Sequence, residues 1–236
     1  MLLYQRGEAR MPSIELITPE RMYERSMQRR KFIFFTVLAL IVILIGFKTV
    51  YSRGKDNAIA GLPVPVQGEA SGGTSMKIGK YDVTLDYIAS YDIDALVIST
   101  HNYSGSGLDS RLVPRDIALA WGKVAEYNTR IDFNWSQSGR FCRFELHGDD
   151  YRNARQYCPN YECEASNNHL IACDSSTRSK IKKIRRGDHV RIKGYLVNLS
   201  AVTSDGKTYY WNSSTSRSDT GNGACELIYV TSIDWK

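Results

Sequence analysis

The sequence lacks the short motifs that identify many enzymes. It has no paired carboxylates at helical spacing, no phosphate-binding loop before a helix, no nucleophile elbow and no His-Glu-x-x-His zinc motif. It also lacks internal repeats of the lengths typical of solenoids and propellers. The composition, 42% hydrophobic and 24% charged residues, excludes a disordered, collagen-like or multi-span membrane chain. These absences favour a binding or structural role over catalysis.

Most of the chain also lacks a large excess of positive charge. The formal net charge is +6, but the first 31 residues carry +3 and Lys48 adds one, which leaves +2 for the residues after Ser52. This excess is too small for a domain whose main partner is a phosphate backbone. Nucleic acid is therefore not the expected partner.

One long apolar run is present. Residues 32–47 contain no charge. Residues 49–51 extend this run to the about 20 residues that a bilayer-spanning helix needs, because the side chain of Lys48 can extend to the membrane interface. We therefore expect a transmembrane helix at 32–51 that contacts the lipid bilayer and serves as an uncleaved signal anchor. A buried core helix normally shows a polar stripe, and a cleaved signal peptide has a shorter apolar region. The basic residues ahead of the run predict a cytoplasmic N-terminus.

The pattern around this run divides the chain into four parts. We expect a cytoplasmic tail at 1–31, the transmembrane helix at 32–51, a flexible linker at 52–75 with Pro63, Pro65 and several glycines, and an extracytoplasmic β-rich domain at 76–236. The predicted location is the inner, or cell, membrane, which the chain crosses once. The C-terminal domain would then lie in the periplasm or outside the cell.

The C-terminal domain is predicted to be α+β and rich in β-strands. Apolar alternation predicts strands at 81–87, 91–100, 169–173, 187–197, 209–212 and 224–233, and a hairpin over 131–146 with its turn at 136–139. Helical spacing predicts two short helices, at 114–124 and at 174–185 with Asp174 as N-cap, and residues 147–168 form a polar loop. A glycine at position 194 within a strand is typical of a twisted, partly closed sheet of the oligonucleotide-binding or SH3-like type.

Five segments of the domain resemble a known family. They are Asp-Ile-Ala-Leu-Ala-Trp-Gly (116–122), Ser-Gln-Ser-Gly-Arg (136–140), Asn-His-Leu-Ile (168–171), Arg-Gly-Asp-His-Val-Arg-Ile-Lys-Gly-Tyr-Leu-Val (186–197) and Asp-Thr-Gly-Asn-Gly-Ala-Cys-Glu (219–226). Together they are similar to a family of uncharacterised bacterial single-pass inner-membrane proteins with one extracytoplasmic domain. That family has no established activity, so the resemblance implies a topology and no catalytic residue. The loop at 148–167 and Cys173 depart from its pattern.

All five cysteines follow the predicted membrane span, where an oxidising compartment would allow disulfides. The disulfide candidates are Cys158 with Cys163 in one loop and Cys142 with Cys173 on two predicted strands, although the spacing leaves the connectivity open. A zinc site competes with this interpretation. Because no Cys-x-x-Cys pair is present, we predict neither a metal nor a cofactor.

Cys225 supports a second hypothesis. It follows a glycine-rich segment, and with His169 or His189 it could form the nucleophile and base of a thiol-dependent enzyme of the cell envelope. The competing interpretation is a buried thiol on a strand that enters the core, where it is inert.

The basic run after residue 177 supplies the remaining candidate binding residues, which are Arg178, Lys182, Lys183, Arg185 and Arg186. They are either a solvated helix face or a surface for an acidic partner. If the topology were reversed, they would favour a nucleic-acid-binding domain. The leading prediction is a membrane-anchored extracytoplasmic adaptor that binds a protein of the cell envelope, within a secretion, transfer or envelope-maintenance assembly. The sequence makes no prediction of the oligomeric state.

Overall fold

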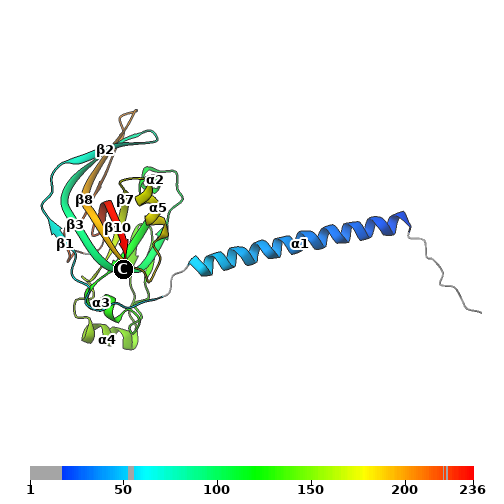
Figure 1. Cartoon of the computed structure of the whole chain (residues 1–236), viewed down its shortest axis with the longest axis horizontal. Coiled ribbons are helices and arrows are strands. Elements are labelled where there is room, and N and C mark those ends of the chain that lie inside the picture. Colours follow the sequence, from blue (N-terminus) through cyan, green and yellow to red (C-terminus); the bar gives the residue numbers. More distant parts are fainter. Residues whose placement is uncertain (1–17, 53–55, 220, 222) are drawn as a thin grey trace, which may run out of the picture. The chain divides into compact units, whose positions relative to one another are not determined.

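The chain forms two compact units, Met1–Ser52 and Arg53–Lys236. A computed structural model describes residues 18–52, 56–219, 221 and 223–236, with the backbone alone over 45–52. The first unit contains the helix α1 (Pro19–Ser52), and the second contains the sheet and the other helices (Figure 1). The predicted tail at 1–31 lies outside the described residues up to position 17.

The membrane span predicted at 32–51 is contradicted by this structure. Among the residues it describes, no helix is long and apolar enough to cross a membrane. The described side chains of α1 end at Leu44, and the turns before Phe32 carry Arg25, Arg29, Arg30 and Lys31. The described apolar part is therefore shorter than the about 20 residues that a crossing requires. The rest of the predicted span lies outside the described side chains, and the predictions of a signal anchor and of a single-pass inner-membrane location are wrong by the same finding.

Five strands of the second unit pair in a closed circuit. They are β3 (Tyr81–Asn102), β4 (Arg115–Ala120), β7 (Ala165–Ala172), β8 (His189–Thr203) and β10 (Glu226–Trp235). Around the circuit, β3 pairs with β4, β4 with β7, β7 with β10, β10 with β8, and β8 again with β3. Only the β7–β10 pair is parallel. The sheet is therefore a small barrel, and its two longest strands, β3 and β8, extend beyond it (Figure 1).

The extensions of β3 and β8 form an arm with two short strands, β2 (Gly73–Ile78), which pairs with β3, and β9 (Thr208–Asn212), which pairs with β8. A third short strand, β1 (Val66–Gly68), pairs with residues 90–92 of β3 in the barrel. A β-bulge between Tyr87 and Ala89 divides the barrel from the arm. Since a bulge changes the face to which alternate side chains point, Val83 and Leu85 belong to a different apolar cluster from Ile93.

The two apolar clusters lie on opposite faces of the barrel wall. Neighbouring residues of a strand point to opposite faces, and Leu170 of β7 belongs to the first cluster while Ile171 belongs to the second. The first cluster holds Ile93 and Ile192 and fills the barrel. The second lies on the outer face, where α2 (Leu108–Leu112) contributes Leu108 and Leu112. The outer faces of β7 and β10 are therefore covered by elements of the same chain.

The connection from β4 to β7 holds most of the remaining elements. It contains α3 (Gly122–Tyr127), the hairpin of β5 (Ser136–Ser138) and β6 (Phe141–Arg143), and α4 (Gly148–Tyr157). Between β7 and β8 lies α5 (Ser175–Lys183), whose N-cap Asp174 accepts a hydrogen bond from the Thr177 N–H at 2.7 Å. The long connection carries the hairpin that lines the cavities described below.

The prediction of a β-rich α+β domain is confirmed, and so is the helix that begins after Asp174. The helix predicted at 114–124 is wrong, because residues 115–120 are the buried strand β4 and the helix α3 begins only at Gly122. The predicted polar loop contains α4, and the described domain has more than two helices. The predicted linker is ordered in its described part: Leu62 is buried, its carbonyl accepts the Gly122 N–H at 3.1 Å, and β1 lies within it.

The glycine predicted to mark a closed sheet lies where two strands approach closely. A Cβ atom on Gly194 would lie 2.0 Å from the backbone oxygen of Tyr229 on β10. Residues with a side chain cannot occupy this position unless β8 and β10 move apart. The glycine therefore permits the close packing of the barrel wall at this point.

Candidate functional site

Two adjoining cavities open beside the β5–β6 hairpin. The first, which we call the aromatic cavity, has a volume of about 500 Å³ and is lined by Trp135, Phe144 and Tyr161, among others. The second, the β9 cavity, has a volume of about 420 Å³ and is lined by Tyr209 and Trp211, among others. Phe141 and Cys225 line both. The two cavities therefore share part of their walls and together make one candidate site.

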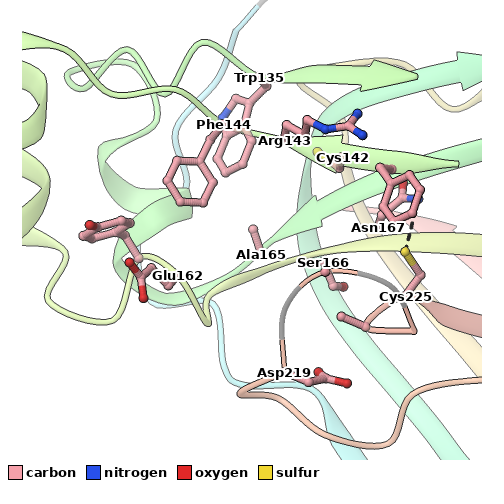
Figure 2. A pocket seen from close by; sticks show the side chains of 14 residues that line it. Trp135, Cys142, Arg143, Phe144, Glu162, Ala165, Ser166, Asn167, Asp219 and Cys225 are labelled. Carbon is pink, nitrogen blue, oxygen red and sulfur yellow. Dashed lines mark hydrogen bonds between the residues drawn. The ribbon is translucent and has the colours of Figure 1, made fainter. Parts of the chain in front are cut away.

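The walls of the aromatic cavity come from distant parts of the chain. In Figure 2, Trp135 and Phe144 lie on one side of the cavity, and Asn167 and Cys225 lie on the other. The rings of Trp135 and Phe144 meet edge to face at 5.8 Å, and Phe144 meets Tyr161 in the same way at 5.6 Å. This packing fixes one apolar wall opposite a polar one.

At the floor of the β9 cavity lies His169, which is paired with a buried carboxylate, Asp116, behind it. Asp116 of β4 and His169 of β7 are direct partners in the sheet register, and both point to the outer face. Asp116 Oδ1 and His169 Nδ1 are 2.8 Å apart, and both side chains are almost fully buried. The His169 ring packs against Trp211 with its centroid at 4.7 Å. The imidazole at the floor is therefore held between a buried carboxylate and an indole.

Arg140 ties this floor to the hairpin. Its Nη1 donates to Asp116 Oδ1 and to the Val113 carbonyl, both at 2.9 Å, and its Nη2 lies 3.3 Å from Asp109 Oδ2. The guanidinium carbon lies 3.6 Å from the centroid of the Tyr103 ring. Burial, together with the charge of Asp116, raises the pKa of Tyr103 to about 12. The guanidinium is thus held by two carboxylates and an aromatic face.

Hydrogen bonds also fix the backbone conformation of Arg140. Gly139 and Arg140, the central residues of the hairpin turn, have φ angles of 57° and 72°. Both lie in the left-handed region that a type I′ turn requires, and a residue with a side chain is uncommon there. The Arg140 N–H donates to the Tyr103 hydroxyl at 2.9 Å, and its carbonyl accepts from Asn167 Nδ2 at 2.9 Å. These bonds favour the conformation that brings the side chain over Asp116.

The loop after β9 is tied to the barrel by a second buried pair. Arg217 contacts the carboxylate of Glu226, which is 1% exposed, and donates to the Tyr91 hydroxyl at 3.1 Å. Burial raises the pKa of Glu226 to about 7, and the charge of Arg217 opposes this rise. The same loop supplies Asp219 to the aromatic cavity, so this pair holds one of its walls.

The thiol predicted as a nucleophile is present in the site, but it is not activated. Cys225 and His169 line the same cavity, as one version of that hypothesis requires. The Cys225 sulfur, however, lies 3.7 Å from Asn167 Nδ2 and 3.7 Å from the Arg140 carbonyl, and among the described residues no hydrogen bond joins it to His169. Burial raises its pKa to about 11, which leaves it protonated near neutral pH. His189 lies elsewhere, with its Nε2 atom 2.6 Å from Asp94.

All five cysteines are free thiols in this structure. Cys142 lies in the aromatic cavity with Cys225, while Cys173 contacts Thr177 of α5 at 3.4 Å. Cys158 is buried, and its thiol donates to the Lys123 carbonyl at 3.4 Å. The structure thus places Cys142 and Cys225 in one cavity. The pairings of Cys142 with Cys173 and of Cys158 with Cys163 stay predictions.

The predicted basic residues do not line either cavity. They lie on α5 and the turn that follows it, where Lys182, Lys183 and Arg185 are exposed. Arg178 donates to the Arg111 carbonyl at 2.8 Å, and Arg186 contacts Asp56 at 2.6 Å. Two of the five are therefore engaged with other parts of the chain. No group of His, Cys, Asp and Glu residues suited to a metal occurs in the described part of the chain.

Three residues of the site and its support, Asp116, Arg140 and Asn167, were not singled out from the sequence. They are far apart in the chain and follow no common spacing. A signal was nevertheless present, because four of the five segments that carry the family resemblance contribute Asp116, Arg140, His169 and Cys225 to this site.

A scan against models of protein families and searches of curated proteins and of solved structures find no match to the chain. The family resemblance accordingly stays an expectation.

Proposed function

We propose that the chain is a non-catalytic binding module that holds a polypeptide segment of a partner protein in its two adjoining cavities. The observation that carries this proposal is the aromatic lining, in which Trp135, Phe144, Tyr209 and Trp211 surround a few fixed polar groups. Apolar cavities with a small number of oriented polar groups are the usual form of a binding site. This is the adaptor role predicted from the sequence, without its membrane anchor and envelope setting.

The strand order supports the same role. Counted along the barrel, the first strand pairs with the second and the fourth, and the third runs parallel to the fifth. We assign this order to the oligonucleotide- and oligosaccharide-binding type, which uses the face of its second and third strands and the adjacent loops to bind ligands. Here those strands are β4 and β7, which carry Asp116 and His169. The cavities thus lie on the face that this barrel type uses.

The charges of the lining disfavour nucleic acid. Three carboxylates, those of Asp109, Glu162 and Asp219, face two guanidiniums, those of Arg140 and Arg143, and Arg140 is already paired. A groove for a single strand combines stacking with an excess of positive charge. We therefore expect a labelled twelve-nucleotide thymidine oligomer not to bind at physiological salt.

The thiol-enzyme alternative has one observation in its favour, the shared cavity of Cys225 and His169. Against it, the raised pKa of Cys225 opposes formation of the thiolate that a nucleophile requires. A binding module does not need the thiol as a nucleophile, so Cys225→Ser, which keeps a small polar side chain in the cavity wall, should still form the protein adduct described next.

Site-specific photo-crosslinking in the source cells tests the proposal. The full chain carries the photoreactive residue benzoylphenylalanine at Tyr209, which is 38% exposed in the β9 cavity, or as a control at Tyr151 of α4, which is 44% exposed. We expect a discrete protein adduct at position 209, its loss in the additional variant Trp211→Ala, and no such adduct at position 151. An adduct that a nuclease removes, or the same adducts at both positions, would contradict the proposal.

A further inference from the structure

The strand β9 has one edge without a partner. Within the described chain it pairs only with β8. Two backbone hydrogen bonds mark the hydrogen-bonded pairs at the two ends of the β8–β9 ladder. The Ser213 N–H donates to the Val197 carbonyl, and the Thr203 N–H donates to the Lys207 carbonyl. In antiparallel strands, hydrogen-bonded pairs alternate with pairs that are not hydrogen-bonded. The backbone groups of Tyr209 and Trp211 therefore bond to β8. The N–H and C=O groups of Thr208, Tyr210 and Asn212 therefore point away from β8.

This edge lacks the devices that normally prevent a strand from pairing with another chain. Sheet edges are usually protected by Lys, Pro, a bulge or a covering element. The residues of β9 are Thr-Tyr-Tyr-Trp-Asn, its register with β8 is regular, and Tyr210 is 69% exposed. The edge strand β2, in contrast, carries Lys77 with 71% of its side chain exposed. The edge of β9 is thus a template for an added strand.

The charges beside this edge determine which strand would fit. Asp109 lines the β9 cavity with Tyr209 and is 43% exposed, and Asp219 and Glu162 are exposed in the adjoining aromatic cavity. The one cation among the described residues that line the β9 cavity is Arg140, and its charge is already paired with Asp109 and Asp116. Carboxylates next to aromatic faces favour lysine and arginine side chains.

We propose that β9 accepts an extended basic peptide as an added strand, with backbone hydrogen bonds to Tyr210 and its neighbours and with alternate Lys or Arg side chains over the β9 cavity. This mode rests on the proposed function and specifies the chemistry of the bound segment. Backbone bonds to the edge provide affinity, and side chains at every second position provide selectivity.

Fluorescence anisotropy with three labelled nine-residue peptides tests this mode on the full chain. The first alternates Thr and Lys, the second alternates Thr and Glu, and the third is the Thr–Lys peptide with every second backbone nitrogen methylated. We expect the first to bind about tenfold or more tighter than either of the others, because each loses one of the two proposed contributions.

Two variants of one residue separate backbone pairing from contact with a ring. Tyr210→Pro removes the N–H that points away from β8, while Tyr210→Ala removes the ring and keeps that N–H. We expect Tyr210→Pro to weaken the Thr–Lys peptide about tenfold and Tyr210→Ala to weaken it less; circular dichroism checks that both variants fold. Equal losses, or equal binding of the Lys and Glu peptides, would overturn the added strand. Binding of none of the peptides would overturn it as well. The proposed function is tested separately: it fails if the adduct at position 209 is absent, is removed by a nuclease, or forms equally at position 151.

Discussion

Arg140 connects three parts of the domain through one guanidinium. It reaches Asp116 on β4 and Asp109 on α2 from the tip of the β5–β6 hairpin. Arg140→Met would leave Asp116, which is 0% exposed, as a buried carboxylate without its cation. Breaking a buried pair in this way typically costs about 3 kcal/mol or more. We expect urea unfolding to report a loss of this size.

Arg143 provides the matched control for Arg140. It lies on the same hairpin, but it is exposed, and among the described residues its side chain donates hydrogen bonds only to Ser138. Arg143→Met should change the free energy of unfolding by no more than about 0.5 kcal/mol. The double variant Arg140→Met with Asp116→Asn should lose less than the two single variants together, because no charge then stays unpaired. Equal losses at Arg140 and Arg143 would show that the buried network does not stabilise the domain.

Glu226 makes the stability of the domain depend on pH. Burial raises its pKa from 4.5 to about 7 in the folded chain, so the folded state binds the proton more tightly than the unfolded state. The contribution of Glu226 to stability is therefore fully present below pH 4.5 and is lost as the pH rises to about 7. Between pH 4.5 and 7, the free energy of unfolding should fall by about 1 kcal/mol or more further in the unmodified chain than in Glu226→Gln, as measured by urea unfolding at each pH. Glu162→Gln, at an exposed carboxylate, should give a curve parallel to that of the unmodified chain.

The pairing of β8 with β10 depends on the absence of a side chain at Gly194. Gly194→Ala places a Cβ atom 2.0 Å from the Tyr229 oxygen, so the two strands must separate. We expect a loss of about 3 kcal/mol or failure to fold, because overpacking against backbone cannot be relieved by a rotamer change. In Gly206→Ala the new Cβ meets nothing within 4 Å, and its φ of 78° costs about 1 kcal/mol. Thermal unfolding that ranks the two variants in the opposite order would contradict the close approach.

The alternation of hydrogen bonds along β9 predicts different costs for proline at neighbouring positions. Tyr209→Pro removes a bond to β8 and should destabilise the chain by about 3 kcal/mol, whereas Tyr210→Pro removes only an N–H that points away from β8. We expect the second change to cost less than about 1 kcal/mol in urea unfolding. The reverse order would mean that the opposite edge of β9 pairs with β8.

At the scale of the molecule, local signals predicted part of the fold. The cap at Asp174 acts within one turn of its helix, so the sequence around it was sufficient. In β4, by contrast, residues 116–120 are all buried, so the strand lacks the alternation of apolar and polar residues that identifies a half-buried strand. Its apolar residues also fit the spacing of a helix, and the sequence therefore predicted a helix there. The floor of the site could not be predicted, because Arg140 meets Asp116 only after the barrel closes and a left-handed turn directs its side chain. Closure depends on contacts between distant strands, which no local pattern reveals.

Closure of the barrel also predicts where the domain is most resistant to opening. The pairs of Tyr91 with Gly194 and Ile93 with Ile192 join the two ends of the circuit and are buried on the barrel side, whereas β9 is bonded along one edge and Val202 in the arm is 45% exposed. Opening the arm exposes less apolar surface than opening the circuit. Hydrogen–deuterium exchange should therefore be slowest in residues 91–96 and 190–196 and about tenfold or more faster in 208–212. Equal protection in the two regions would indicate that the arm and the barrel open as one cooperative unit.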